Sequence, residues 1–224
     1  MFEQEKAEMI KAGMKMDRYG LIALSGGNVS ERTSTGEILI TPSGMIYEDM
    51  KPEDILVMDL KGNIIEGERK SSSDTEGILY IFQNRDDINA VIHTHQPYAT
   101  AIGLIQEEFE VNLTTLANAC GGNVAVTPFS SAGSIDMGKD TVQYLGDSLA
   151  VILANHGVMA VGNSLKQALY AAVYLEEAAK CYLAAKNVGN PKKMTKEQIT
   201  QAVEVFHYYG QGTPAIPKEL VKRV

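Results

Sequence analysis

The sequence predicts an α/β fold in which one domain spans residues 1–224. Segments with apolar residues at helical spacing alternate along the chain with short apolar runs that end at Gly, Pro or Asn. No internal repeat or low-complexity linker interrupts this alternation. A chain of 224 residues with 45% hydrophobic content also lies within the size that one core supports. Together these observations favour a single layered structure of helices and sheet.

Helices are expected where apolar side chains recur every three or four residues. The first ends at Gly20, because glycine readily adopts the left-handed conformation of a helix C-cap. Ser164 with Gln167, and Thr195 with Gln198, have the spacing of capping boxes and predict two further helix starts. The expected helices cover residues 7–20, 74–85, 98–105 (entered through Pro97) and 164–186, with a last one from 195 onward.

Strands are expected in apolar runs that alternate or are bounded by turn residues. Two short strand regions are joined by tight turns in the first third of the chain, and the later runs are more continuously apolar. The expected strand segments are 36–44, 54–68, 90–95, 123–129 and 149–162, the last taken as one strand.

Composition excludes several classes of function. The formal net charge of -8 and the pI of about 5.1 argue against a nucleic-acid partner, which would require a basic surface. The apolar runs are shorter than the roughly 20 residues that span a bilayer, and residues 1–13 lack the apolar stretch of a signal peptide. Cys120 and Cys181 are too few for a disulfide framework. We therefore expect a cytoplasmic protein without a membrane partner.

The histidines are the strongest candidate ligands for a metal. His93 and His95 stand two residues apart at the end of an apolar run, so on a strand both imidazoles face the same side. His156 ends another apolar run, and three such nitrogens could hold zinc with a position left open. Structural histidines with ordinary hydrogen-bond partners are the alternative. His207, beside two tyrosines, has the pattern of a surface or interface residue.

Three small polar turns have the composition of an anion site: residues 25–30, 41–44 and 71–74. Glycine lets backbone N–H groups approach an anion, and Ser and Asn supply neutral donors. None is a P-loop, since no Gly-Lys-Ser/Thr follows the glycines. Each taken alone fits a plain turn better. Asp74 opens a predicted helix, where it is equally well explained as an ordinary N-cap.

Seven motifs in order resemble the class II aldolase and sugar-phosphate epimerase family, to which the adducin head domain also belongs. They are SGGNVS, ITPSGM, SSSDTE, VIHTHQPYATAI, GGNVAVTPF, ANHGVMAVG and FHYYG, and they run from the first helix to about Gly210. The resemblance implies a three-layer α/β/α sandwich, a homotetramer with active sites at subunit interfaces, and a small phosphorylated sugar as substrate. It also implies Zn²⁺ or another divalent metal ion as cofactor.

The same resemblance implies roles for individual residues. The metal ligands would be His93, His95 and His156, with Asp74 as either a fourth ligand or the base that moves a proton, and Glu76 as a weaker candidate for the base. Tyr209 would donate a proton to the aldehyde oxygen. The phosphate would be bound by the family's three turns, here Gly27, Asn28, Ser43, Gly44, Ser72 and Ser73.

The motifs do not fully follow either enzyme type of the family. Aspartate at position 74 is the residue of the 4-epimerase that acts on L-ribulose 5-phosphate, whereas the aldolase that acts on L-fuculose 1-phosphate has glutamate. The GGNVAVTPF segment and Tyr209 resemble the aldolase. A second aldolase tyrosine is replaced by Thr114 or Thr115, and the epimerase's aspartate has only Asn118 as a polar match.

We therefore expect an aldolase that cleaves a ketose 1-phosphate of the L-fuculose 1-phosphate type into dihydroxyacetone phosphate and an aldehyde. A metal-stabilised enediolate would be the intermediate. The 4-epimerase is the alternative, since it begins with the same bond cleavage. A non-catalytic adducin-like module is disfavoured because all three histidines are present. No residue excludes a dehydratase or a related aldolase that acts on deoxy or methylthio sugars.

Overall fold

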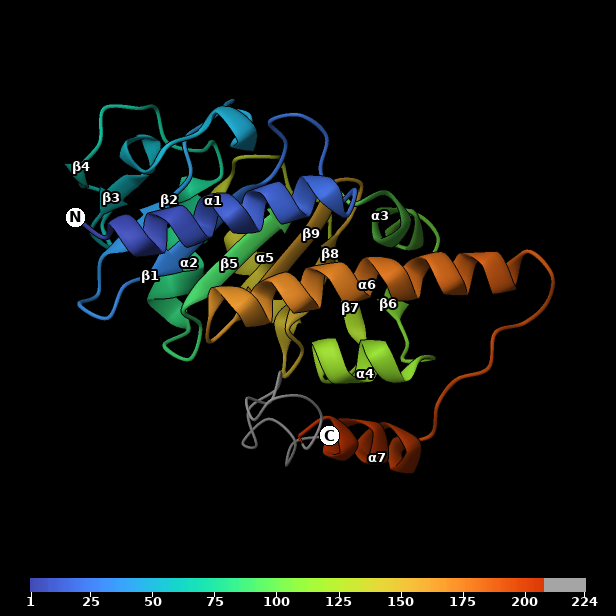
Figure 1. Ribbon diagram of the computed structural model, residues 1–224. Helices are drawn as coiled ribbons and strands as arrows, with labels where there is room; N and C mark the ends of the chain where they lie inside the picture. Colours follow the sequence, from blue (N-terminus) through green and yellow to red (C-terminus); the bar gives the residue numbers. More distant parts are fainter. Residues whose placement is uncertain (208–224) are drawn as a thin grey trace.

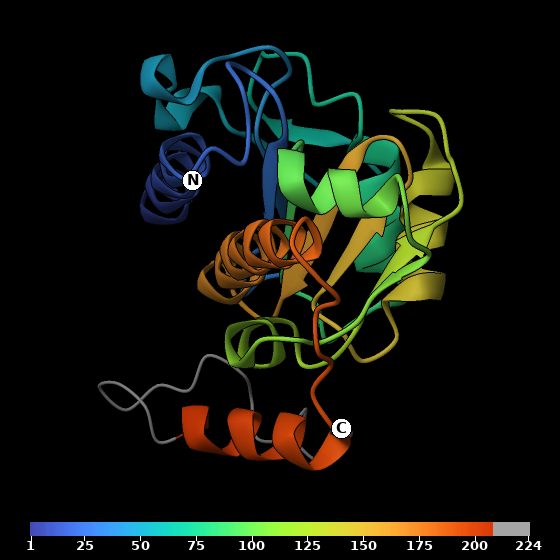
Figure 2. The ribbon, with the colours of Figure 1, turned by 90° about the vertical axis from the view of Figure 1, so that its right-hand side faces the viewer.

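The computed structural model describes residues 1–207 and contains a nine-stranded sheet with helices packed on both faces. Figure 1 looks onto the face covered by two long helices. Figure 2, turned by 90°, shows the sheet between this layer and a second layer of helices. The predicted three-layer α/β/α sandwich is confirmed.

The strands follow the order β4-β3-β2-β1-β5-β9-β8-β7-β6 across the sheet. Neighbours are antiparallel except β7 and β8, which run parallel. The bounds are β1 Asn28–Arg32, β2 Ile38–Ile40, β3 Leu56–Met58, β4 Ile64–Glu66, β5 Ala90–Thr94, β6 Glu108–Phe109, β7 Val124–Thr127, β8 Ala150–Leu153 and β9 Gly157–Gly162.

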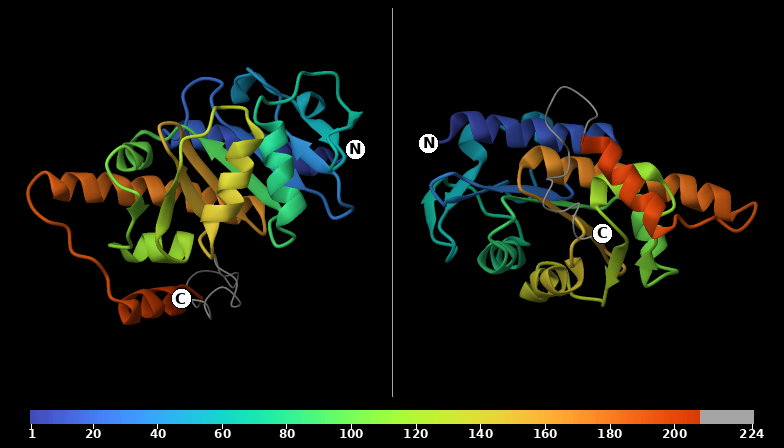
Figure 3. Two further views of the ribbon diagram at one scale, coloured as in Figure 1. Left: turned by 180° about the vertical axis from the view of Figure 1, so that it is seen from behind. Right: turned by 90° about the horizontal axis from the view of Figure 1, so that it is seen from below.

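The long helices α1 and α6 cover one face of the sheet, with α3 packed against α6. Helices α2 and α5 cover the other face, as the view from behind in Figure 3 shows. The bounds are α1 Glu3–Arg18, α2 Thr75–Asn84, α3 Pro97–Gly103, α4 Thr114–Cys120, α5 Ile135–Leu145, α6 Leu165–Lys186 and α7 Lys196–His207, with short 3₁₀ turns η1 Tyr47–Asp49 and η2 Pro52–Asp54. Within residues 1–207, no helix has both the length and the hydropathy to cross a membrane.

The centre of the core lies along β5, β9 and β8, in which every residue is buried. Helices cover both faces here, so these strands are continuously apolar instead of alternating. The prediction of one strand over residues 149–162 is wrong, because β8 and β9 form a hairpin. The chain reverses at Asn155, which has a φ of 58°, a left-handed conformation that asparagine tolerates better than most residues.

Most predicted helices are confirmed, and the capping pairs explain two of their starts. Thr195 and Gln198 cap α7 reciprocally: the Thr195 N–H donates to Gln198 Oε1 over 2.9 Å, and the Gln198 N–H to Thr195 Oγ1 over 3.3 Å. Ser164 caps α6 by accepting from the Gln167 N–H over 3.4 Å, although the Gln167 side chain accepts from the backbone of Asn163 instead.

Two strands and two α-helices were not predicted from the sequence: β1, β6, α4 and α5. Helix α5 contains Gly138, a residue unfavourable in a helix interior. A Cβ at Gly138 would lie 2.1 Å from the Gly77 carbonyl oxygen, so glycine is required for the close contact between α5 and α2. This contact fixes the position of α2, whose first turn begins beside Asp74.

Candidate metal centre

Antiparallel pairing of β5 with β9 brings the three predicted histidine ligands together. His93 lies on β5 opposite Met159 of β9. His95 follows the end of β5, and His156 stands in the β8–β9 turn directly before β9. One ligand atom from each of the three lies within 4.8 Å of the others, and the ring centroids are 4.7–5.2 Å apart. The sequence prediction that these side chains converge is thus confirmed geometrically.

Backbone contacts set the proton position on His93. Its Nδ1 lies 3.0 Å from the Val158 carbonyl oxygen, which can only accept, so Nδ1 carries the proton and donates. The lone pair is then on Nε2, which faces His95 Nε2 at 3.1 Å. Such an outer hydrogen bond to a backbone carbonyl is the usual way in which proteins orient a metal-binding imidazole.

Burial favours the neutral form of two of the three imidazoles, those of His93 and His156. It lowers the pKa of His93 from its ordinary value of 6.5 to about 4, with a partly opposing effect of Asp74 and a further lowering by the other two imidazoles. Burial and then the neighbouring His95 also lower the pKa of His156. Since only a neutral imidazole can donate its lone pair to a metal, both side chains are in the required state at neutral pH.

The donor set fits a tetrahedral metal ion. Bonds of about 2.0–2.1 Å from zinc to nitrogen place two tetrahedral ligands about 3.3 Å apart, close to the 3.1 Å between His93 and His95. His156 Nδ1 is buried and has no hydrogen-bond partner within the described residues. His95 is exposed, so one side of the group is open to solvent. The group can therefore hold one metal ion and still admit a ligand from solution.

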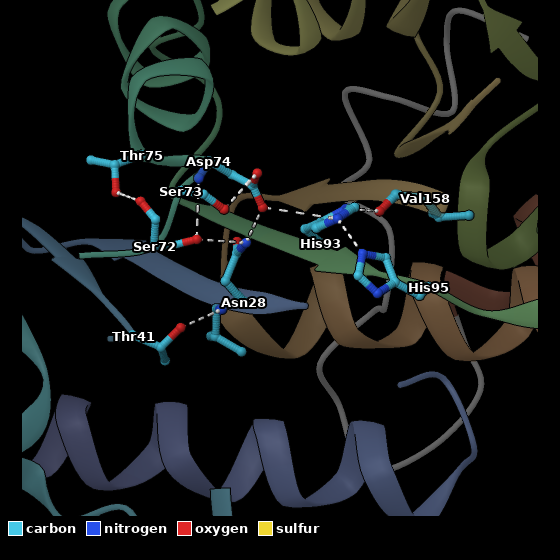
Figure 4. A network of polar contacts seen from close by, with 10 residues as sticks. Asn28, Thr41, Ser72, Ser73, Asp74, Thr75, His93, His95 and Val158 are labelled. Atoms are coloured by element: carbon cyan, nitrogen blue, oxygen red, sulfur yellow. Dashed lines mark hydrogen bonds and ion pairs between the residues drawn. The ribbon is translucent and has the colours of Figure 1, made fainter. Parts of the chain in front are cut away.

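Asp74 reaches the same centre from the other helix layer (Figure 4). It occupies the N-cap position of α2, but its carboxylate does not cap the helix. Asp74 Oδ2 instead accepts from Asn28 Nδ2 over 2.8 Å and lies 3.9 Å from His93 Nε2. Asn28 is placed there because β1 pairs with β5 with Asn28 directly opposite His93. The set of donor atoms within 4.8 Å of one another does not include Asp74.

The three glycine- and serine-containing turns meet beside this centre. Asn28 Nδ2 also donates to Ser72 Oγ over 3.2 Å, and the Ser43 N–H donates to the Lys70 carbonyl over 2.9 Å. Gly27 has a φ of 72°, and a Cβ there would lie 2.4 Å from the His93 carbonyl oxygen, so no larger residue fits. Gly44 and Ser73, the other predicted phosphate-binding residues, belong to the same turns, and the Ser73 side chain is exposed.

Of the two remaining catalytic candidates, Glu76 alone lies within the residues that the structure describes. Tyr209 is outside residues 1–207, which the structure describes. Glu76 is exposed in the first turn of α2. Sequence reasoning missed the Val158 carbonyl, because a backbone acceptor has no sequence signal and follows only from the β5–β9 register.

Comparisons with known proteins agree with this geometry. The family model described as "Class II Aldolase and Adducin N-terminal domain" matches residues 7–183. A 5-deoxy-D-ribulose 1-phosphate aldolase of Bacillus thuringiensis serovar kurstaki is 36% identical over 94% of this chain and 99% of its own length. A 5-methylthioribulose-1-phosphate/5-deoxyribulose-1-phosphate aldolase of Rhodospirillum rubrum is 30% identical over 91% of each chain. A solved L-fuculose 1-phosphate aldolase superposes with a TM-score of 0.84 at 35% identity, covering 90% of this chain and 95% of its own.

The chain belongs to the class II aldolase and adducin N-terminal domain family. Within that family it is a class II aldolase, of the type that includes the fuculose-phosphate and deoxyribulose-phosphate aldolases.

The lowered pKa of His93 predicts how the metal-free protein responds to acid. Unfolded histidine takes up a proton below pH 6.5, whereas folded His93 stays neutral down to about pH 4. The unfolded state binds more protons in this window, so stability should fall as pH falls, by on the order of 3 kcal/mol from this residue. Urea unfolding with a chelator, from pH 7 to 4, should show the wild type losing more stability than His93→Asn. Parallel pH profiles for the two proteins would contradict the assignment.

Proposed function

We propose that this chain is a metal-dependent aldolase that cleaves a ketose 1-phosphate into dihydroxyacetone phosphate and an aldehyde. The observation that carries the proposal is the group of three convergent imidazoles with the Asp74 carboxylate 3.9 Å from one of them. Two relatives that match nearly the whole chain are named as aldolases, which supports the same reaction.

A divalent ion, with Zn²⁺ as our choice, would be held by His93, His95 and His156 and would act as a Lewis acid toward neighbouring oxygens of the ketose. Cleavage of the bond between C3 and C4 leaves its electron pair on the dihydroxyacetone phosphate half as an enediolate. A cation held by the three histidines would stabilise the negative charge that develops on the enediolate oxygens.

We assign phosphate binding to Gly27, Asn28, Ser43, Gly44, Ser72 and Ser73. The support is that the three turns are hydrogen-bonded to one another next to the histidines. Neutral donors bind a dianion well only when several act together, and the N-terminus of the ten-residue helix α2 adds a favourable dipole. Binding the phosphate here would position C2 and C3 of the sugar over the metal.

We assign proton transfer at the enediolate carbon to Asp74. Its carboxylate is held by Asn28 and stays outside the closely spaced donor group, which favours the role of a base over that of a fourth ligand. Cleavage must also remove a proton from the C4 hydroxyl that becomes the aldehyde. We assign that proton to Tyr209, which would accept it as a phenolate. In the reverse condensation the resulting phenol would donate it to the aldehyde oxygen.

The substrate is proposed to be a deoxyketose 1-phosphate. Both 5-deoxyribulose 1-phosphate and L-fuculose 1-phosphate end in a methyl group, and cleavage of either gives dihydroxyacetone phosphate with a short aldehyde. A cytoplasmic homotetramer remains our prediction for the assembly and its location, supported by the family resemblance. The 4-epimerase is retained as a second candidate because position 74 is aspartate.

The first test follows dihydroxyacetone phosphate release by the zinc-loaded protein from L-fuculose 1-phosphate and from 5-deoxyribulose 1-phosphate. We expect release from at least one substrate, and loss of both release and bound zinc in His93→Ala. L-Ribulose 5-phosphate is assayed in parallel. Its interconversion at C4 without net cleavage would favour the epimerase, and inactivity on all three substrates would refute the proposed substrate class.

The second test separates the two roles of Asp74. If Asp74 is the base, Asp74→Asn should lower kcat by about 10²-fold or more while zinc affinity stays within a few-fold of the wild type. Glu76→Gln is the matched control, since Glu76 is an exposed carboxylate in the same helix turn and should leave kcat nearly unchanged. A large loss of zinc affinity in Asp74→Asn would instead make Asp74 a ligand.

A further inference from the structure

His95 differs from the other two histidines because its imidazole is exposed. The ring contacts the imidazoles of His93 and His156, but packing holds it less firmly than the buried ring of His93. The residues on either side, Thr94 and Gln96, are both completely buried. The position of the His95 ring must depend mainly on how firmly the backbone of residues 94–96 is held.

Contacts on both sides hold that backbone. The His95 N–H donates to the Leu21 carbonyl over 3.1 Å. Gln96 then anchors the chain to α6: its Nε2 donates to the Ala172 carbonyl over 3.2 Å, and its Oε1 accepts from Thr94 Oγ1 over 2.7 Å. Gln96 is the N-cap of α3, yet its side chain is engaged elsewhere and does not cap the helix.

The cap of α3 comes instead from Glu176, one helical turn beyond Ala172 on α6. Glu176 Oε1 accepts from the Tyr98 N–H over 3.0 Å, and Oε2 accepts from the Ala99 N–H over 2.9 Å. Pro97 has no N–H, so the two carboxylate oxygens satisfy the next two free donors of the helix. One face of α6 therefore binds residues 96–99 through two consecutive turns.

Burying the Glu176 carboxylate costs free energy that an apolar side chain at this position would not cost. Glu176 is completely buried, and burial raises its pKa, an effect opposed by the two amide donors. A carboxylate buried in an apolar environment destabilises the fold unless it is fully hydrogen-bonded. The two N–H groups that donate to Glu176 belong to Tyr98 and Ala99, three and four residues after the ligand His95.

We propose that Glu176 is a positioning residue for the metal ligand His95, acting through the start of α3. The inference rests on the proposed metal site. Glutamine at this position would present one oxygen and one NH₂ group to two N–H donors, so one hydrogen bond would be replaced by a donor–donor contact. The start of α3 would move, and His95, whose ring is exposed, would move with it.

The test measures zinc affinity by competition with a chromophoric chelator, using the full-length protein. Glu176→Gln should bind zinc about tenfold more weakly than the wild type, the lower end of the range for groups that orient a ligand. Glu177→Gln is the matched control: Glu177 is the next residue on α6, is 54% exposed and pairs with Lys180. It should retain wild-type affinity. Far-UV circular dichroism checks that both variants keep their helices.

If folded Glu176→Gln binds zinc with wild-type affinity and only its Tm is lower, the role of Glu176 is structural. That result would overturn this inference but leave the proposed metal site intact. If Glu176→Gln does not fold, Glu176→Asp decides, since it keeps both oxygens but withdraws them by one methylene group. It should also weaken zinc binding, and unchanged affinity would refute the inference. A wild-type protein that binds no zinc would remove the metal site itself, and the inference with it.

Discussion

The pairing of β5 with β1 on one side and β9 on the other is the constraint on which the site depends. The β1 register sets Asn28 opposite His93, and the β9 register sets Val158 and the β8–β9 turn beside it. A shift of one residue in either ladder would turn these side chains to the opposite face of the sheet. Residues separated by up to 130 positions thereby meet at one end of the central strands, with α2 adding Asp74 from the second layer.

Electrostatics at this end of the strands depends on the protonation state of His93 and on the orientation of Asp74. Burial favours the neutral form of His93, and the Val158 carbonyl fixes which nitrogen carries the proton. Asp74 is oriented by Asn28 and not by its own helix. The site is therefore preformed by hydrogen bonds from backbone and neutral side chains. Such preorganisation lets a bound ion and a carboxylate act on a substrate with little rearrangement.

Sequence patterns predict the histidine ligands and the layered fold because both follow from local periodicity. His93 and His95 are two residues apart on an apolar strand, which is sufficient to place them on one side. The β8–β9 hairpin was missed because an uninterrupted apolar run carries no alternation to mark Asn155 as a turn. Helix α5 was missed because Gly138 serves a tertiary contact with α2. The function of Glu176 was also hidden, since its hydrogen-bond donors lie 77 and 78 residues away.

The central claim is that three imidazoles hold one ion with a position left open for substrate. Diffraction data on either side of the zinc absorption edge, from crystals of zinc-loaded protein, test it directly. The predicted result is one anomalous peak about 2.0–2.1 Å from a ring nitrogen of each of His93, His95 and His156, with no Asp74 oxygen at that distance. A peak on other residues, or none at these three, would contradict the account.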